Sequence, residues 1–135
     1  MKDLNELKET FSFVPDWMDR YGVIIELGKE LPPAADGLHD EANIVRGCMS
    51  KVWVRTSVED GTMQFEGDSD AAIVRGLIAV IFLALRGMTP AQVAAYDVAA
   101  EFEALGLSSN LSPNRRNGFA SMIGVIRSAA AAAAA

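Results

Sequence analysis

Residues 71–86 restrict the fold more than any other part of the chain. The run from Ala71 to Leu85 is apolar on almost every side and is interrupted only by Arg75. It is too short to span a bilayer, which takes ~20 residues, and a helix that is apolar all round must be enclosed by other elements. We therefore expect a buried central helix over Ala71–Arg86, with Asp70 as the acidic cap at its positive end.

The segment before this helix alternates between apolar and polar residues, which predicts two antiparallel strands. Glu59-Asp60-Gly61 is typical of a hairpin turn. The expected inward positions are Val52, Val54, Thr56 and Val58 on the first strand and Met63 and Phe65 on the second. Together with Ile44-Val45, these strands are expected to form a small antiparallel sheet.

Five further helices are predicted, each from apolar residues at helical spacing and a residue that favours a helix start. Their expected first residues are Asp3, Asp16, Thr89-Pro90, Asp97 and Ser112-Pro113. Pro15 ends the first of them and Pro32-Pro33 ends the second. Residues 34–43 and 106–112 are expected to be polar loops. This order of elements predicts an α+β fold in which the small sheet packs against helices.

Length and charge narrow the classes of protein that fit. At 135 residues the chain is long enough for one domain, 1–135, with a core of its own. Its net charge of −6 argues against nucleic acid or an anionic membrane as a partner, and a single cysteine permits no internal disulfide. We expect a soluble, cytoplasmic protein. Ala129–Ala135 is a low-complexity tail to which we assign no function.

The only cysteine, Cys48, follows Gly47 in a loop between two extended segments. Arg46 and Lys51 flank it, and positive charge favours the thiolate, which is the nucleophilic form. A lone cysteine is also often no more than a small buried apolar residue. His39 could pair with the thiol, although a surface or capping histidine is the commoner role. The residues alone leave these readings open.

Other site chemistries find little support. One cysteine and one histidine cannot supply the usual four ligands of a zinc site. The sequence has no EF-hand, no paired-histidine motif, no Walker loop and no dinucleotide-binding fingerprint. Carboxylate metal sites remain possible from the residues alone.

The start of the last helix breaks local rules. Arg115 and Arg116 fall in its first turn, where the helix dipole disfavours positive charge by about 0.3 kcal/mol or more. Gly118 weakens the same helix by ~1 kcal/mol. Such departures indicate either a functional site or interface, or a solvated charged turn.

Four stretches of the sequence, in order, carry a family resemblance. They are Tyr21–Gly28 with Leu31-Pro32, Gly47–Trp53, Gly67–Val80, and Leu111–Arg115 with Gly118. With these stretches the chain resembles the SufE family of sulfur-acceptor proteins, which work with cysteine desulfurases in iron–sulfur cluster assembly. The resemblance implies a SufE/IscU-like α+β fold, similar to that of iron–sulfur scaffold proteins.

The resemblance also implies a function. Cys48 would take persulfide sulfur from a SufS-like cysteine desulfurase, stimulate that enzyme, and pass the sulfur to a SufBCD-like scaffold complex. No metal and no organic cofactor would be needed on this chain. Gly47, Ser50, Asp70 and Arg115 would support the cysteine loop or contact the partner, although Arg116 competes with Arg115 for that place. Because a cluster scaffold typically needs about four thiolates or a His-substituted set, a single cysteine favours a carrier.

Three alternatives remain from the sequence. The chain could stimulate a desulfurase by docking alone, or it could be a free-standing cysteine hydrolase or transferase. It could also be a paralogue that feeds a different sulfur pathway. For a carrier we further expect that apolar neighbours shield the sulfur of Cys48 at rest.

Overall fold

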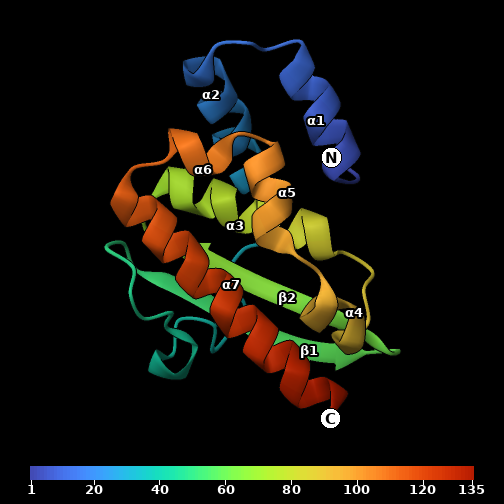
Figure 1. Ribbon diagram of the computed structural model, residues 1–135. Helices are drawn as coiled ribbons and strands as arrows, with labels where there is room; N and C mark the ends of the chain where they lie inside the picture. The colour runs from blue at the N-terminus through green and yellow to red at the C-terminus, as the bar shows by residue number, and fades with distance from the viewer.

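The computed structural model describes residues 1–135 and contains seven α-helices, one 3₁₀ helix and a two-stranded antiparallel sheet (Figure 1). The elements are α1 (Leu4–Ser12), α2 (Trp17–Gly28), η1 (Glu41–Asn43), β1 (Val52–Glu59), β2 (Thr62–Ser69), α3 (Ala72–Leu85), α4 (Pro90–Ala95), α5 (Val98–Ala104), α6 (Leu107–Asn110) and α7 (Pro113–Ala134). The expected α+β class is confirmed.

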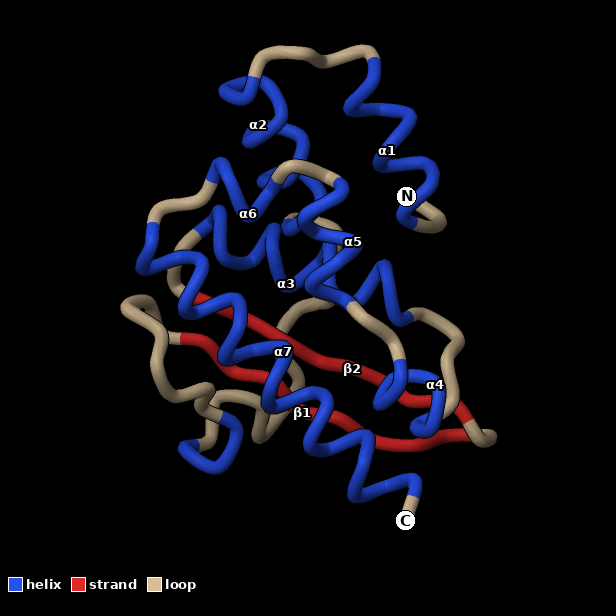
Figure 2. Tube along the Cα trace, in the orientation of Figure 1, coloured by secondary structure: helices blue, strands red, loops and turns tan.

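The central element is α3, as its apolar sequence predicts. Its side chains Leu77, Ile78 and Ile81 are completely enclosed. On one side α2 approaches very closely, because a Cβ on Gly28 would lie 2.6 Å from the backbone nitrogen of Gly76. On the other side α3 packs on β2. In Figure 2, α7 runs diagonally across the hairpin, so the strands are covered by helices on that face.

The hairpin forms as predicted. Its strands pair in one register from Val52 opposite Ser69 to Glu59 opposite Thr62. Asp60 and Gly61 make the turn with φ of 52° and 80°, the left-handed pair that matches the twist of a two-residue hairpin. The inward face includes Val52, Val54 and Met63, which are buried. Val58 is exposed, although Met63, its partner on the other strand, is buried.

Ile44 and Val45 do not form the third strand that the sequence suggests. Ile44 makes a single bridge with Trp53, and the N–H of Val45 donates to the carbonyl of Val52 at 2.9 Å. The pairing is short because η1 ends at Asn43 and Gly47, with φ of 87°, turns the chain away. Only a few residues between them can lie beside β1.

The five expected helix starts are confirmed. The side chains of Asp3, Asp16, Thr89, Asp97 and Ser112 each accept a backbone N–H from the first turn of α1, α2, α4, α5 and α7. Two boundaries differ from expectation. Helix α2 ends at Gly28, before the two prolines, and residues 107–110 form the short helix α6 instead of a loop.

Asp70 does not cap α3, so that expectation is wrong. The N-cap is Ala71, which offers no side-chain hydrogen bond. Strand β2 continues to Ser69, and Asp70 therefore lies across from Lys51 at the open end of the hairpin. Its carboxylate accepts the backbone N–H of Lys51 at 3.1 Å, and its own N–H donates to the Lys51 carbonyl at 3.3 Å.

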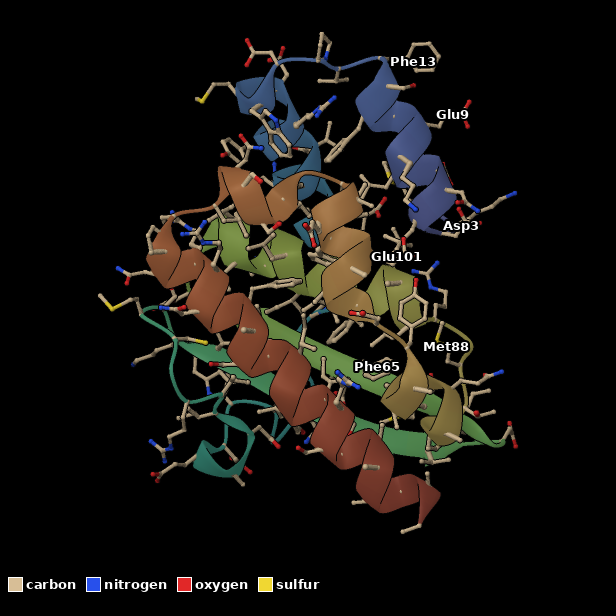
Figure 3. All side chains as sticks on the ribbon, in the orientation of Figure 1. Asp3, Glu9, Phe13, Phe65, Met88 and Glu101 are labelled. Atoms are coloured by element: carbon tan, nitrogen blue, oxygen red, sulfur yellow. The ribbon has the colours of Figure 1, made fainter.

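The terminal helices are tied to the body of the molecule. Nζ of Lys8 in α1 lies 2.8 Å from Oε2 of Glu101 in α5. Phe13, just beyond the other end of α1, points into solvent (Figure 3). At the other terminus, most of the alanine tail belongs to α7, and Ala130 is fully buried. None of the helices combines the length and the apolar character that crossing a membrane requires.

Candidate functional site

The cysteine loop, which we define as residues 46–51, connects Val45 to β1 and lies against the first turns of α7 (Figure 1). Gly47 adopts a φ of 87°, which favours glycine. A Cβ at this position would also lie 2.7 Å from Oγ of Ser121 in α7. Backbone geometry and lack of space therefore both require glycine immediately before Cys48.

The thiol of Cys48 is partly buried against α7. Its S–H donates to the carbonyl oxygen of Gly118, with Sγ and oxygen 3.6 Å apart. Burial raises the pKa of Cys48 above that of an ordinary thiol, because loss of water disfavours the thiolate. The resting thiol is therefore protonated at neutral pH and is a weak nucleophile.

The two basic neighbours do not offset this burial. Arg46 is exposed and turns toward Glu41, with Nη2 3.4 Å from Oε1. Neither Arg46 nor Lys51 lines the cavity in which the thiol lies. The expectation that these charges favour the thiolate is therefore not confirmed for the resting protein.

A cavity of about 230 Å³ opens beside Cys48. One side of it is apolar and the other carries the polar groups of the cysteine loop and the start of α7. Its lining residues are Cys48, Met49, Ser50, Val52, Val74, Leu77, Ser112, Asn114, Arg115, Gly118, Phe119 and Met122. A second sulfur atom attached to Cys48 could be accommodated there.

Arg115, and not Arg116, lies at this cavity. Arg116 donates to the carbonyl of Ser108 at 3.2 Å, which holds it toward α6. The guanidinium of Arg115 makes no ion pair within the chain. A positive charge at the opening of a thiol cavity can attract an anionic sulfur species or a carboxylate of a partner.

The structure thus brings the expected site residues together. Gly47 and Ser50 belong to the cysteine loop, Arg115 lies across the cavity, and Asp70 holds the loop's last residue, Lys51. The sequence predicts Asp70 both as the cap of α3 and as a support of the cysteine loop; it does not cap α3, and its hydrogen bond reaches the last residue of the loop.

His39 does not pair with Cys48. Its Nε2 lies 2.7 Å from Oδ2 of Asp68, and its ring contacts that of Trp53 at a centroid distance of 4.3 Å. None of the residues that line the cavity is a histidine, aspartate or glutamate. The chain has no group of three or more His, Cys, Asp or Glu side chains placed to hold a metal ion.

Comparison with known proteins identifies the family. Residues 5–130 match the SufE family model, described as an Fe-S metabolism associated domain. The chain belongs to the SufE family. It is 44% identical over 131 residues to an uncharacterized SufE-like protein of Rhizobium etli, covering 94% of this chain and 88% of the relative.

The fold of this SufE-family chain is shared with a protein of known structure. The solution structure of a hypothetical protein from Thermus thermophilus superimposes with a TM-score of 0.79 at 22% identity. The match covers 97% of this chain and 95% of the other. At this identity the likeness concerns the fold, and it agrees with helices packed on a small antiparallel sheet.

Gly118 is the site residue whose role the sequence did not show. It stands out in the sequence as an unfavourable residue inside a helix. Its contact with Cys48 joins residues 70 positions apart, and no local pattern reports such a contact. The stretches that carry the family resemblance include this glycine, and the structure places it directly behind the thiol.

Proposed function

We propose that this SufE-family protein accepts sulfur on Cys48 from the persulfide of a cysteine desulfurase and delivers it to an iron–sulfur cluster scaffold. The observation that carries the proposal is the position of the only cysteine. It lies in a loop, next to a cavity large enough for one more sulfur atom, within reach of an unpaired arginine. The family's link to Fe-S metabolism agrees with this role.

The transfer is an exchange at sulfur. The thiolate of Cys48 attacks the outer sulfur of the desulfurase persulfide, and a new S–S bond forms at Cys48. The bond between the outer and inner sulfur of the desulfurase breaks, and its cysteine leaves as a thiolate. The number of S–S bonds is unchanged, so no external oxidant or reductant is needed. The proton of the Cys48 thiol passes to solvent before the attack.

The resting geometry requires that the loop moves before this step. Burial keeps Cys48 protonated, and attack needs both a thiolate and an open approach to the target sulfur. We infer that docking of the desulfurase draws the cysteine loop out of its cavity, with Gly47 absorbing the change in backbone angles. Afterwards the loaded loop can return and shield the new S–S bond from other thiols.

Three neighbouring residues have separate roles in this transfer. Asp70 fixes the end of the loop through Lys51, Ser50 lines the cavity, and Arg115 can pair with the anionic persulfide. We expect this chemistry in the cytoplasm, where thiols stay reduced. The products would feed a scaffold complex, and no resident cofactor takes part in the exchange.

A second candidate function is stimulation of a desulfurase by docking alone. The protonated, partly buried state of Cys48 favours it, because such a thiol is unreactive until it is exposed. A free-standing cysteine hydrolase is disfavoured, since no general base lines the thiol cavity.

The test is mass spectrometry of the protein after incubation with cysteine and a SufS-like desulfurase. We expect Cys48 to gain one or more sulfur atoms that a reductant removes. The Cys48→Ser variant should gain none. Equal sulfur on the serine variant would end the carrier proposal, and stimulation that survives in Cys48→Ala would favour activation by docking.

A further inference from the structure

The contact between Gly118 and Cys48 raises the question of why a helix interior carries glycine there. A Cβ built on Gly118 would lie 3.3 Å from Sγ of Cys48 and 3.7 Å from its Cα and Cβ. These three are the nearest atoms, so an added methyl group meets the cysteine before anything else. The first distance is shorter than an ordinary van der Waals contact between carbon and sulfur, and one of the two partners must shift.

The cysteine is the partner that can move. The next residue of α7, Phe119, is buried, and so is Met122 one turn further on. Both therefore anchor the helix in the core. The cysteine loop is held at its ends, by the hydrogen bonds between Lys51 and Asp70 and by the exposed pair of Arg46 with Glu41, while Cys48 itself is held by the weak hydrogen bond from its thiol to Gly118. A side chain at position 118 would consequently push Cys48 away from α7.

Resting on the proposed function, we propose that Gly118 is a positioning residue for sulfur transfer. The missing side chain leaves the space in which Cys48 rests between partners, and the backbone carbonyl of Gly118 accepts a hydrogen bond from its S–H. The glycine weakens α7, and in return the site gains a resting position that keeps the sulfur shielded. After loading, the inner sulfur has no proton to donate, and the space left by the missing side chain lets it lie against α7 with the outer sulfur in the cavity.

The first experiment measures alkylation of Cys48 by iodoacetamide in the free protein, without a desulfurase. In Gly118→Ala we expect alkylation to be about fivefold faster, which corresponds to ~1 kcal/mol in the balance between resting and exposed loop. The pH midpoint of alkylation should also fall toward that of a free cysteine, because the displaced thiol regains water. A merely structural change in α7 would not move this midpoint.

Gly124→Ala is the matched control. Gly124 lies in the same helix, and a Cβ there would meet nothing within 4 Å. This variant should melt slightly higher than the wild type and leave the alkylation rate and its pH midpoint unchanged. Equal rates in the wild type and Gly118→Ala would overturn the positioning role, and so would slower alkylation in Gly118→Ala.

A double substitution separates positioning from misfolding. In a Cys48→Ala background the crowding sulfur is absent, so Gly118→Ala should raise the melting temperature as Gly124→Ala does. A drop in melting temperature in that background would show that the methyl group disturbs other contacts, and the proposal would fail.

The last arm follows the loaded sulfur. Wild type and Gly118→Ala are loaded by the desulfurase, separated from it, and exposed to dithiothreitol. We expect the variant to lose its sulfur several times faster. If both proteins load and lose sulfur at equal rates, sulfur acceptance stands and the role of Gly118 fails. If neither protein loads, the proposed function fails, while the alkylation data still decide the position of the thiol.

Discussion

The hairpin holds two loops, and it holds them in different ways. The polar loop, residues 34–43, is attached to the hairpin by two charged side chains: Arg55, which Glu66 orients through two hydrogen bonds at 2.9 Å, donates to the carbonyl of Asp36, and His39 pairs with Asp68. The cysteine loop is held at its end by two hydrogen bonds between Lys51 and Asp70 and at its start by an exposed pair between Arg46 and Glu41, whereas Cys48 itself is held by the thiol contact at 3.6 Å. Hydrogen bonds to thiols are weak, so the cysteine loop is the one that can be released.

This difference assigns separate tasks to the two loops. A loop fixed along its length by charge-assisted hydrogen bonds keeps its shape when a partner docks. The middle of the cysteine loop, where Cys48 makes one weak hydrogen bond, can exchange that contact for contacts with a partner at small cost. We infer that the polar loop shapes the surface and that the cysteine loop performs the transfer.

The largest expected effect is loss of sulfur uptake in Cys48→Ser, because a serine hydroxyl does not form the thiolate that the exchange needs. As a control, Glu66→Gln alters only the residue that orients Arg55 toward the polar loop and should load normally. Both are measured by intact mass after reaction with a desulfurase and cysteine. Loss of uptake in both variants would remove the distinction between the loops.

The next effect separates two adjacent arginines. Arg115→Gln should slow sulfur uptake by roughly tenfold, because a positive charge near a developing anion stabilises the transition state. Arg116→Gln, which alters a residue bonded to α6, should not. Single-turnover transfer rates are the measurement, and melting temperatures should be nearly unchanged in both. Equal uptake rates for the two variants would leave Arg115 without a role.

Asp70→Ala should loosen the cysteine loop. The loss of its hydrogen bond to Lys51 should lower the free energy of unfolding by about 1 kcal/mol and should make alkylation of Cys48 several times faster. His39→Gln is the comparison, since it loosens the polar loop instead. We expect its alkylation rate to match the wild type, and a rise in both variants would show that the loops move together.

The smallest effect is a pH dependence of the Arg55–Glu66 pair, which orients Arg55 toward the polar loop. The hydrogen bond from Arg55 holds the pKa of Glu66 below its usual range. The stabilisation is therefore present above the unfolded pKa of about 4.3 and is lost as the pH falls through the folded value. Because both side chains are partly exposed, solvent screening keeps the contribution below ~1 kcal/mol. In Glu66→Gln the melting temperature should depend less on pH in this range.

Much of the fold follows from local patterns. The helix starts at Asp3, Asp16 and Ser112 and the turn at Asp60-Gly61 rest on neighbouring residues, and the structure confirms them. Asp70 shows where local reasoning ends. It stands just before a helix, as a cap would, but the continuation of β2 to Ser69 places it opposite Lys51. The pairing of the whole β2 strand decides whether Asp70 caps the helix or bonds to Lys51.

The sequence predicts the central residues of the site, Gly47 and Cys48, but not the contacts that α7 makes with them. The Gly47-Cys48 pair is local and its family motif is specific. The wall behind the thiol comes from α7, 70 residues away, and the choice between Arg115 and Arg116 depends on how that helix is rotated. The sequence predicts the family and the nucleophile, while the contacts that restrain the nucleophile require the structure.

The most direct test of the central claim follows one sulfur atom from donor to acceptor. A desulfurase is loaded with persulfide, freed of cysteine, and mixed with this protein, and both proteins are weighed by mass spectrometry over time. Our account predicts that the peptide containing Cys48 gains a sulfur atom as the desulfurase loses one, in equal amounts. If the desulfurase keeps its sulfur in this mixture, while this protein stimulates its turnover in a parallel assay with cysteine, the account is contradicted.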